Sequence, residues 1–247
     1  MRVSVLGGCG VWPAAGQAGS GYLVEQDGFR LVADTGYATL PRLLELITAD
    51  EADAVFISHG HPDHCADLNP LLRARALRED PPAPLPVYAL PGALGAVLAL
   101  DRPGMLDSAY ELREFTAGES FRIGPFQAST RPLPHWVPNA GLRLAAGGSV
   151  FAYVGDGAPA PAAAEIASRA SLLLAEATYV DTVPEDSRAG LSSARDAGRL
   201  AAQAGAGQLM LTHLRPGTSH QAARAAAAAE YGGHISVAAS GLSVVPG

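Results

Sequence analysis

The chain has 247 residues and a formal net charge of −7, from 17 basic and 24 acidic side chains. Apolar residues make up 48% of the sequence, which excludes an intrinsically disordered protein, and a chain of this length can bury a core without disulfides. No apolar run approaches the roughly 20 residues that span a bilayer. The net acidity also argues against a surface for long nucleic acids.

All 17 basic residues are arginines, which excludes a phosphate-binding lysine of the Walker type, a Schiff-base lysine and a lysine general base. The two cysteines, Cys9 and Cys65, are too few for a disulfide framework. The first residues lack the pattern of a signal peptide and are typical of a strand. We therefore expect a protein of the reducing cytoplasm.

Short apolar strands alternate with helical stretches along the chain. The first half predicts strands over residues 1–6, 22–26, 29–33 and 54–57. Asp27-Gly28 is a two-residue hairpin signal between the second and third of these strands. Helices are expected to open at Thr39 and to run from Cys65 to about Arg78. The proline-rich stretch 81–86 is expected to be a linker within one domain, because the alternation resumes at Val87.

The second half predicts more strands, over residues 121–123, 126–131, 142–145, 150–154, 172–175, 209–212 and 235–238. Helices are expected between several of them, over residues 160–168, 192–204 and 218–230. This order favours two sheets packed face to face with helices outside, a four-layer αββα sandwich formed by residues 1–247 as a single domain. Periodicity alone does not distinguish it from another layered α/β fold.

One loop concentrates the side chains that bind metals. Three of the seven histidines, His59, His61 and His64, lie with Asp63 between a predicted strand and a predicted helix. Neutral imidazole and carboxylate ligands suit borderline cations such as Zn²⁺. The alternative is a solvated polar loop, but the spacing favours a metal site.

Three further candidates each follow a predicted strand. They are His135, Asp156 and His213. A single histidine is more often structural than a ligand. However, all three share the carboxyl end of a strand, where α/β folds build their sites. A site with two metals would need these residues in addition to the loop.

The order H-x-H-x-D-H, then a separate His, then Gly-Asp, then His-Leu-x-Pro, resembles the metallo-β-lactamase-fold hydrolases over nearly the whole chain. The resemblance implies an αββα sandwich with two metals at one edge. It implies seven ligands, with His59, His61 and His135 on a first metal, Asp63, His64 and His213 on a second, and Asp156 bridging the two. Asp34 matches an aspartate that supports the site from behind, although a plain strand-end cap is the alternative.

Within this superfamily the chain is most similar to the phosphodiesterase branch related to transfer RNA 3′-processing nuclease. The similarity lies in residues 20–24, 176–178 and 213–216. Two departures from the nuclease pattern argue against transfer RNA as the substrate. Only 21 residues separate His135 from Asp156 (156 − 135), which leaves no room for the nuclease's RNA-binding arm, and Ala175 replaces a catalytic histidine. The resemblance therefore implies a small phosphodiester, such as a 3′,5′-cyclic nucleotide.

The expected chemistry needs two Zn²⁺ ions, which would bind a bridging water and lower its pKa toward neutrality; Mn²⁺ or iron would fit the same ligands. Asp63 is expected to orient the resulting hydroxide. Glu176, also a candidate catalytic residue, is expected to hold a ligand histidine through its second nitrogen. His220 is a candidate general acid, its alternative being an exposed histidine near a helix start.

Four residues are candidate substrate contacts. Arg215 would bind a phosphate, unless it is an ordinary surface arginine. Trp136 would stack on a base, with a core or dimer-interface role as the alternative. Asn139 would line the cleft beside it, and Tyr179 would face the substrate. Related phosphodiesterases are often homodimers, so the resemblance also raises a homodimer as an expectation.

Two other functions remain open at this point. The same fold and metals would serve an amide, lactone or thioester hydrolase, or a nuclease that processes RNA. A non-enzymatic metal-binding protein is the third alternative, and the presence of all seven ligands argues against it.

Overall fold

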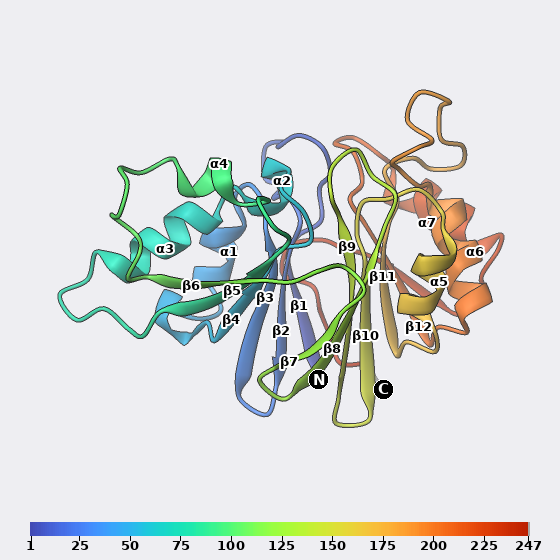
Figure 1. The fold of residues 1–247 in the computed structure, drawn as a ribbon. Helices are drawn as coiled ribbons and strands as arrows, with labels where there is room; N and C mark the ends of the chain where they lie inside the picture. The colour runs from blue at the N-terminus through green and yellow to red at the C-terminus, as the bar shows by residue number, and fades with distance from the viewer. Residues whose placement is uncertain (247) are drawn as a thin grey trace.

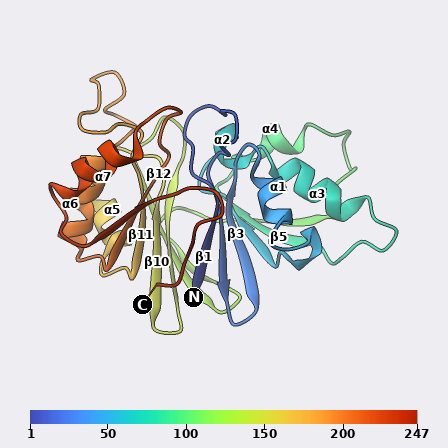
Figure 2. The ribbon, with the colours of Figure 1, turned by 180° about the vertical axis from the view of Figure 1, so that it is seen from behind.

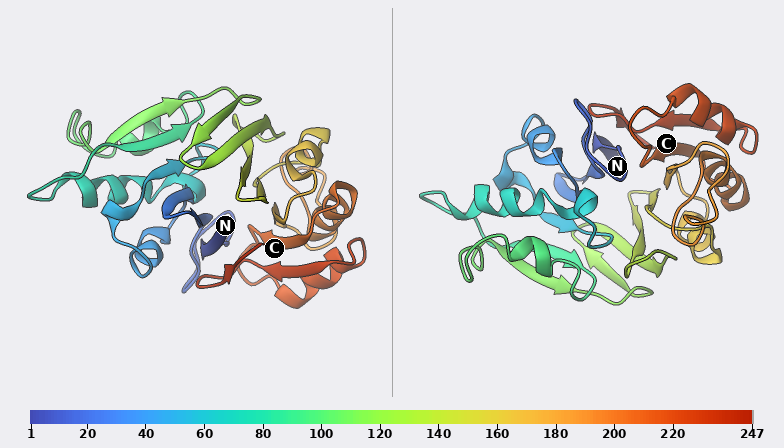
Figure 3. Two further views of the ribbon diagram at one scale, coloured as in Figure 1. Left: turned by 90° about the horizontal axis from the view of Figure 1, so that it is seen from below. Right: turned by 90° about the horizontal axis from the view of Figure 1, so that it is seen from above.

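Two mixed β-sheets face each other in the computed structural model, which describes residues 1–246 (Figure 1). The first sheet has the strand order β14-β1-β2-β3-β4-β5-β6, and the second has the order β13-β12-β11-β10-β9-β8-β7. Seen from above and below, the sheets lie side by side with the helices outermost (Figure 3). The four-layer αββα sandwich predicted from the sequence is confirmed.

The first sheet comes mostly from the first half of the chain. Its strands are β1 (Arg2–Gly7), β2 (Gly21–Gln26), β3 (Phe29–Thr35), β4 (Ala54–Phe56), β5 (Leu85–Ala89), β6 (Tyr110–Glu114) and β14 (Ser243–Val244). The predicted hairpin joins β2 and β3, with Asp27 and Gly28 both at positive φ, as a tight hairpin turn requires.

The second sheet comes from the second half. Its strands are β7 (Ser120–Ile123), β8 (Phe126–Pro132), β9 (Ala140–Ala146), β10 (Ser149–Val154), β11 (Leu172–Glu176), β12 (Gln208–Thr212) and β13 (His234–Val237). The strands β10 to β13 run parallel, so their carboxyl ends meet at one edge. After β13 the chain crosses to the first sheet and forms β14 there (Figure 2).

Helices cover the outer face of each sheet (Figures 1 and 2). Those beside the first sheet are α1 (Thr39–Leu44), the short helix Ala49–Glu51, α2 (Pro62–Cys65), α3 (Leu68–Ala76) and α4 (Gly95–Leu98). Those beside the second sheet are α5 (Pro161–Ala167), α6 (Ala194–Ala204) and α7 (His220–Ala228). Within residues 1–246, no helix has the length and apolar character needed to cross a membrane.

Three apolar layers hold the sandwich together. The central layer lies between the sheets and contains the largest buried aromatic side chains, among them Tyr22, Phe56, Phe126, Phe151 and Tyr153. Two outer layers fill the space between each sheet and its helices. Burying one such side chain stabilises a fold by about 1.5–3 kcal/mol, so the layers fix the positions of the strand ends that carry the candidate site.

Two predicted elements differ from the structure. The single helix expected from Cys65 to Arg78 is broken between α2 and α3, because Asp67 is tied to the β3–α1 turn. Its amide donates to the Thr35 carbonyl at 2.8 Å, and its carboxylate accepts from the Leu40 amide at 2.8 Å.

The expected linker 81–86 ends earlier than predicted, because β5 begins at Leu85. Pro86 is tolerated there because the pairing of β5 with β4 begins only at Val87. The strand β6 was not predicted, since it is an exposed edge strand with the charged sequence YELRE.

Candidate metal centre

The seven predicted ligands come from four loops that follow strands and meet at one edge of the sandwich. The loop after β4 and helix α2 supply four of them, and the turns after β8, β10 and β12 supply one each. They form two groups, in each of which the ligand atoms lie within 4.8 Å of one another. The first group is His59, His61, His135 and Asp156, and the second is Asp63, His64, His213 and Asp156.

In the first group, three imidazole nitrogens converge. His61 Nδ1 lies 3.1 Å from both His59 Nε2 and His135 Nε2. His135 Nδ1 is 2.8 Å from the Gly190 carbonyl, which can only accept a hydrogen bond, so His135 Nδ1 is the protonated nitrogen. In a neutral imidazole, the proton on Nδ1 leaves a lone pair on Nε2, directed toward the other two histidines.

His59 is oriented in the same way through a hydroxyl. Ser58 Oγ donates to the Asp34 carboxylate at 2.8 Å, so it is left to accept from His59 Nδ1 at 3.1 Å. His59 Nε2 therefore also carries a lone pair. The lone pairs of His59 and His135 point toward one shared space, which a cation would occupy without repulsion.

In the second group, His64 and Asp156 face each other without a hydrogen bond. Asp34 accepts from His64 Nδ1 at 2.7 Å, which leaves His64 Nε2 directed at the centre. That nitrogen lies 3.3 Å from Asp156 Oδ1 and 3.8 Å from Asp63 Oδ2. Both His64 Nε2 and Asp156 Oδ1 are buried polar atoms without a hydrogen-bond partner. Such atoms are costly to bury, and a metal ion would satisfy both.

His213 is held by a relay. Its Nδ1 donates to Thr178 Oγ1 at 2.8 Å, and that hydroxyl donates to Glu176 Oε1 at 2.6 Å. His213 Nε2 then lies 3.1 Å from Asp63 Oδ2 and 3.2 Å from Asp156 Oδ2. The expectation that Glu176 holds a ligand histidine directly is therefore corrected, because Thr178 stands between the two side chains.

The Asp156 carboxylate lies between the two groups. Its Oδ2 is 3.9 Å from the Nε2 atoms of His59 and His135, on the side of the first group. The same oxygen is 3.2 Å from His213, and Oδ1 is 3.3 Å from His64, on the side of the second. Asp156 is the one residue that the two groups share. This is the position of a ligand that bridges two cations.

The electrostatics of the centre favour bound positive charge. Burial would raise the pKa of Asp156, but the imidazoles of His213 and His64 hold it well below its usual range. Burial lowers the pKa of His64 and of His213, yet the Asp156 carboxylate outweighs this effect and raises both. Burial also lowers the pKa of His59 well below its usual value, so that ring remains neutral. An ionised carboxylate among imidazole rings is a ligand set that suits divalent cations.

The backbone carries strain at this edge. His213 has φ 59° and Asp34 has φ 57°, a region that residues other than glycine rarely adopt and that costs about 1–3 kcal/mol. Gly10 packs so closely on His213 that a Cβ atom there would lie 2.6 Å from its ring and 2.4 Å from its carbonyl oxygen. These close contacts fix the position of the ligand ring.

Two predicted substrate contacts, Arg215 and Tyr179, pack against each other. The Arg215 guanidinium lies over the Tyr179 ring, with its carbon 4.3 Å from the ring centroid. Within residues 1–246, Arg215 forms no ion pair with a carboxylate. Trp136 is 55% exposed, and its ring centroid is 5.0 Å from that of His135.

Two other predicted residues lie elsewhere. Asn139 is only 4% exposed, its backbone pairs with that of His59, and its amide donates to the Asp156 carbonyl, so it supports the ligands instead of lining an open cleft. His220 is exposed at the first position of α7 and is not among the side chains that meet at the centre. Its candidate role as a general acid stays a prediction.

Several residues at the centre were not predicted. Ser58, Thr178 and the Gly190 carbonyl orient ligand histidines, and the Val11 amide donates to Asp63 Oδ2 at 3.0 Å. Ser58 and Thr178 adjoin motif residues in the sequence, so their proximity was a usable signal. No sequence signal links Val11 or Gly190 to a ligand, because loops that are distant along the chain bring them there.

Replacing Thr178 by valine keeps its shape and removes the relay hydroxyl. We expect metal affinity to fall by about 10–100-fold, because groups that orient a ligand histidine have effects of that size. Competition with a chromogenic chelator measures the affinity. Thr178→Ser is the matched control and should retain it; equal affinity in Thr178→Val and the unmodified protein would contradict the relay.

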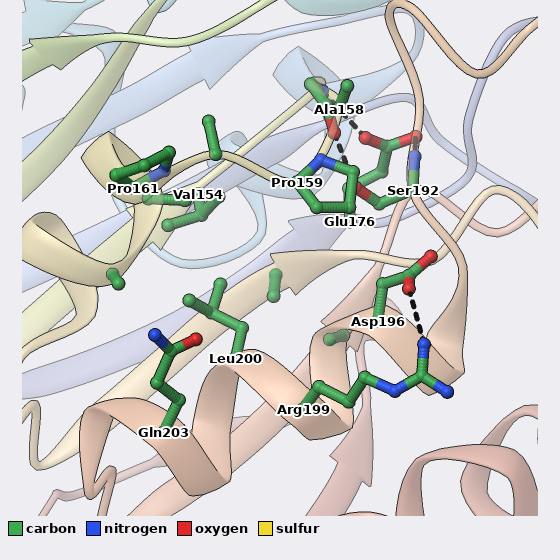
Figure 4. A pocket seen from close by; sticks show the side chains of 16 residues that line it. Val154, Ala158, Pro159, Pro161, Glu176, Ser192, Asp196, Arg199, Leu200 and Gln203 are labelled. Carbon is green, nitrogen blue, oxygen red and sulfur yellow. Dashed lines mark hydrogen bonds and ion pairs between the residues drawn. The ribbon is translucent and has the colours of Figure 1, made fainter.

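A cavity of about 470 Å³ lies between α5 and α6 on the other side of Glu176 (Figure 4). Glu176 lies at one end of it, and the Asp196–Arg199 ion pair lies further along. None of the seven ligands lines this cavity. Burial, and to a smaller extent the charge of the Asp156 carboxylate, raises the pKa of Glu176 to about 8. The cavity is therefore separate from the candidate reaction site.

Comparison with known proteins agrees with this geometry. The model of a family described as a beta-lactamase superfamily domain matches residues 24–214. The probable metallo-hydrolase YhfI of Bacillus subtilis (strain 168) is 31% identical over 247 residues, covering 98% of both proteins. The crystal structure of the metallo-β-lactamase fold protein YhfI from Bacillus subtilis covers 98% of both chains, with a TM-score of 0.89 and 30% identity.

Two further relatives belong to the nuclease branch. A protein named ribonuclease Z from Mycobacterium bovis is 27% identical over 267 residues, covering 96% of this chain and 95% of that protein. The structure of the short form of human tRNase Z covers 100% of both chains with a TM-score of 0.80 and 21% identity, a likeness of fold. In this chain only the β9–β10 hairpin and its flanking turns lie between His135 and Asp156. The chain therefore belongs to the β-lactamase superfamily of metallo-hydrolases, close to YhfI and to the tRNase Z branch but without the RNA-binding arm.

Proposed function

We propose that this metallo-hydrolase is a dinuclear zinc-dependent phosphodiesterase that acts on small phosphodiesters, 3′,5′-cyclic nucleotides first. The observation that carries the proposal is the Asp156 carboxylate, shared by two groups of ligands. Paired metals a few ångströms apart are a recurrent arrangement for in-line displacement at phosphorus, because they act on both the attacking and the leaving oxygen.

His59, His61 and His135 would hold one cation, Asp63, His64 and His213 the other, and Asp156 both. When bound, two such cations supply Lewis-acid chemistry, lowering the pKa of water and neutralising charge on the phosphoryl group. Imidazole and carboxylate ligands suit Zn²⁺, with Mn²⁺ or iron as the alternatives.

Asp63 is the residue proposed to orient the attacking water. Its Oδ2 accepts from the Val11 amide at 3.0 Å, which fixes the carboxylate against rotation. Within residues 1–246 no hydrogen bond uses Asp63 Oδ1, so this oxygen is available to accept a hydrogen bond from the attacking water. Burial would raise the pKa of Asp63, but the hydrogen bond to His213 and the charge of His64 lower it, so the group is ionised and acts as a hydrogen-bond acceptor.

Two side chains support a nucleotide as the substrate. Arg215 follows the ligand His213 by two positions and is not neutralised by a carboxylate, so its guanidinium is available to a phosphate oxygen. Trp136 adjoins the ligand His135 and is 55% exposed, so it is accessible as a stacking platform for a base. Arg215 is proposed to bind the phosphate and Trp136 the base of a nucleotide.

The name ribonuclease Z of the 27% identical relative makes an RNA-processing nuclease the second candidate. The short connection between His135 and Asp156 favours a small substrate instead, because it provides no arm to grip folded RNA. An amide, lactone or thioester hydrolase is the other alternative within the fold.

The proposal is tested by assaying the zinc-loaded protein with bis-p-nitrophenyl phosphate, nitrocefin and a panel of lactones. We expect turnover of the phosphodiester and none of the others. A second panel of cyclic mononucleotides, cyclic dinucleotides and short RNA then ranks the natural substrates, with cyclic mononucleotides expected first. A fully metal-loaded protein that turns over no phosphodiester would refute the proposal.

A further inference from the structure

A second pocket lies beside the second group of ligands. It has a volume of about 330 Å³ and is formed by the loop after β1, the turn between β12 and α7, helix α1 and the segment after β13. Arg42, Arg215 and His220 line it, together with Gly8, Cys9 and Leu214. We propose that this basic pocket binds a phosphate group additional to the phosphodiester that is cleaved at the metal centre.

The charge of the basic pocket supports this assignment. No aspartate or glutamate is among its lining residues, although the whole chain carries a net charge of −7. Arg215 forms no ion pair with a carboxylate in the described part of the chain. Arg42 pairs with Glu45 at 3.0 Å, but the two side chains are 41% and 62% exposed, so a surface pair of this kind is weak and exchangeable. The Arg42 guanidinium is thus available to an anion, and Arg215, which has five N–H donors, would serve this phosphate as well as the phosphodiester at the metals.

The backbone adds hydrogen-bond donors to these cations. Helix α7 begins at His220, and the peptide N–H groups of a helix start carry partial positive charge. Gly217 and Thr218, from the turn that leads into this helix, also line the pocket. Arginine side chains combined with a helix start are a recurrent way to bind phosphate.

The basic pocket and the metal centre share a wall. Leu214 lines the pocket and directly follows the ligand His213. The Gly10 amide donates to the Leu214 carbonyl at 3.0 Å, and Gly10 packs on the His213 ring. One short stretch of backbone therefore separates the two sites. In the proposal, a substrate with two phosphates places one at the metals and the other in the pocket.

The occupant has two sources with the same chemistry. One is the terminal phosphate of a substrate that, unlike a cyclic mononucleotide, carries a second phosphate, such as a short linear dinucleotide; this source rests on the proposed phosphodiesterase function. The other is a free phosphate or phosphorylated product that binds independently. The proposal also gives His220 a role that its position allows, since it lies at the pocket and away from the metal ligands.

The test compares the dinucleotide ApA with its 5′-phosphorylated form pApA on the zinc-loaded protein. The unmodified protein should have a lower KM for pApA than for ApA, and Arg42→Gln should reduce that preference by about tenfold, the effect of losing one charged hydrogen bond. Arg122→Gln removes an exposed arginine of β7, far from the pocket in the fold, and should leave the preference unchanged.

Inorganic phosphate distinguishes the second source. The dissociation constant of inorganic phosphate is measured by calorimetry for the unmodified protein and for Arg42→Gln. It should be about tenfold higher in Arg42→Gln if the pocket binds free phosphate. A changed KM preference or a changed phosphate affinity each supports the pocket. Unchanged values of both in Arg42→Gln and in the double variant Arg42→Gln/His220→Gln would overturn it. Failure of the proposed function is recognised separately, because the unmodified protein would then turn over neither bis-p-nitrophenyl phosphate nor any cyclic nucleotide, whereas its affinity for inorganic phosphate would still be measurable.

Discussion

Replacing Asp156 by asparagine is expected to remove the metal-dependent activity almost completely. The variant keeps the shape of the side chain but exchanges one carboxylate oxygen for an N–H₂ group that cannot bind a cation. Because both groups of ligands share Asp156, both sites should be weakened by one substitution. Metal content should fall from two ions per chain to fewer than one, and kcat/KM on bis-p-nitrophenyl phosphate should fall by at least about 10³-fold, beyond the 10–100-fold effect of groups that only orient ligands.

The matched control is Asp181→Asn, which removes an exposed carboxylate that pairs with Arg195. It should retain the full metal content and activity. If Asp156→Asn still bound two equivalents of metal with unchanged affinity, the bridging position would be wrong.

Replacing Asp34 by asparagine is the second large effect that we expect. The Asp34 carboxylate accepts four hydrogen bonds, from the Ser58 amide and hydroxyl, the Tyr153 hydroxyl and His64 Nδ1. In either orientation the asparagine amide would present its N–H₂ group to at least one of these donors, the Ser58 amide on the Oδ1 side or the other three on the Oδ2 side. Metal affinity should fall by about 10–100-fold. The free energy of unfolding should fall by about 3–5 kcal/mol, the cost of breaking a fully buried charged pair.

Denaturant unfolding with and without a chelator separates these two effects of Asp34→Asn. The loss of stability should persist when the metal is removed, because Tyr153 and Ser58 belong to the same buried network. Asp53→Asn, at an exposed carboxylate that accepts from the Arg30 amide, is the control. An Asp34→Asn protein as stable as this control would show that the network contributes little.

The sequence was most informative where chemistry demands particular residue types at short spacing. The motif from His59 to His64 could be recognised because metal ligands are few in kind and lie close together. The separate ligands His135, Asp156 and His213 could be assigned because each follows a strand, and the carboxyl ends of neighbouring strands meet at one edge.

What the sequence could not supply depends on contacts between loops. The relay from His213 through Thr178 to Glu176 requires side chains on the ends of two paired strands, whose register is a property of the folded sheet. Asn139 was expected to line the cleft because it follows His135 closely. In the fold Asn139 directly precedes β9, and its side-chain amide donates to the Asp156 carbonyl.

Exposed elements were also difficult to predict from the sequence. The strand β6 alternates charged residues at the edge of its sheet, so its sequence lacks the apolar pattern of a buried strand. His220 was expected near the reaction because it lies seven positions after His213 in the sequence. The turn before α7 places it on the outer side of the basic pocket instead.

Anomalous X-ray scattering at the zinc absorption edge, from crystals grown with Zn²⁺, would locate the bound metals. We expect two peaks separated by the Asp156 carboxylate, one beside His59, His61 and His135 and the other beside Asp63, His64 and His213. No peak at this edge of the sandwich, or a single peak that leaves either group of ligands empty at saturating zinc, would contradict this expectation.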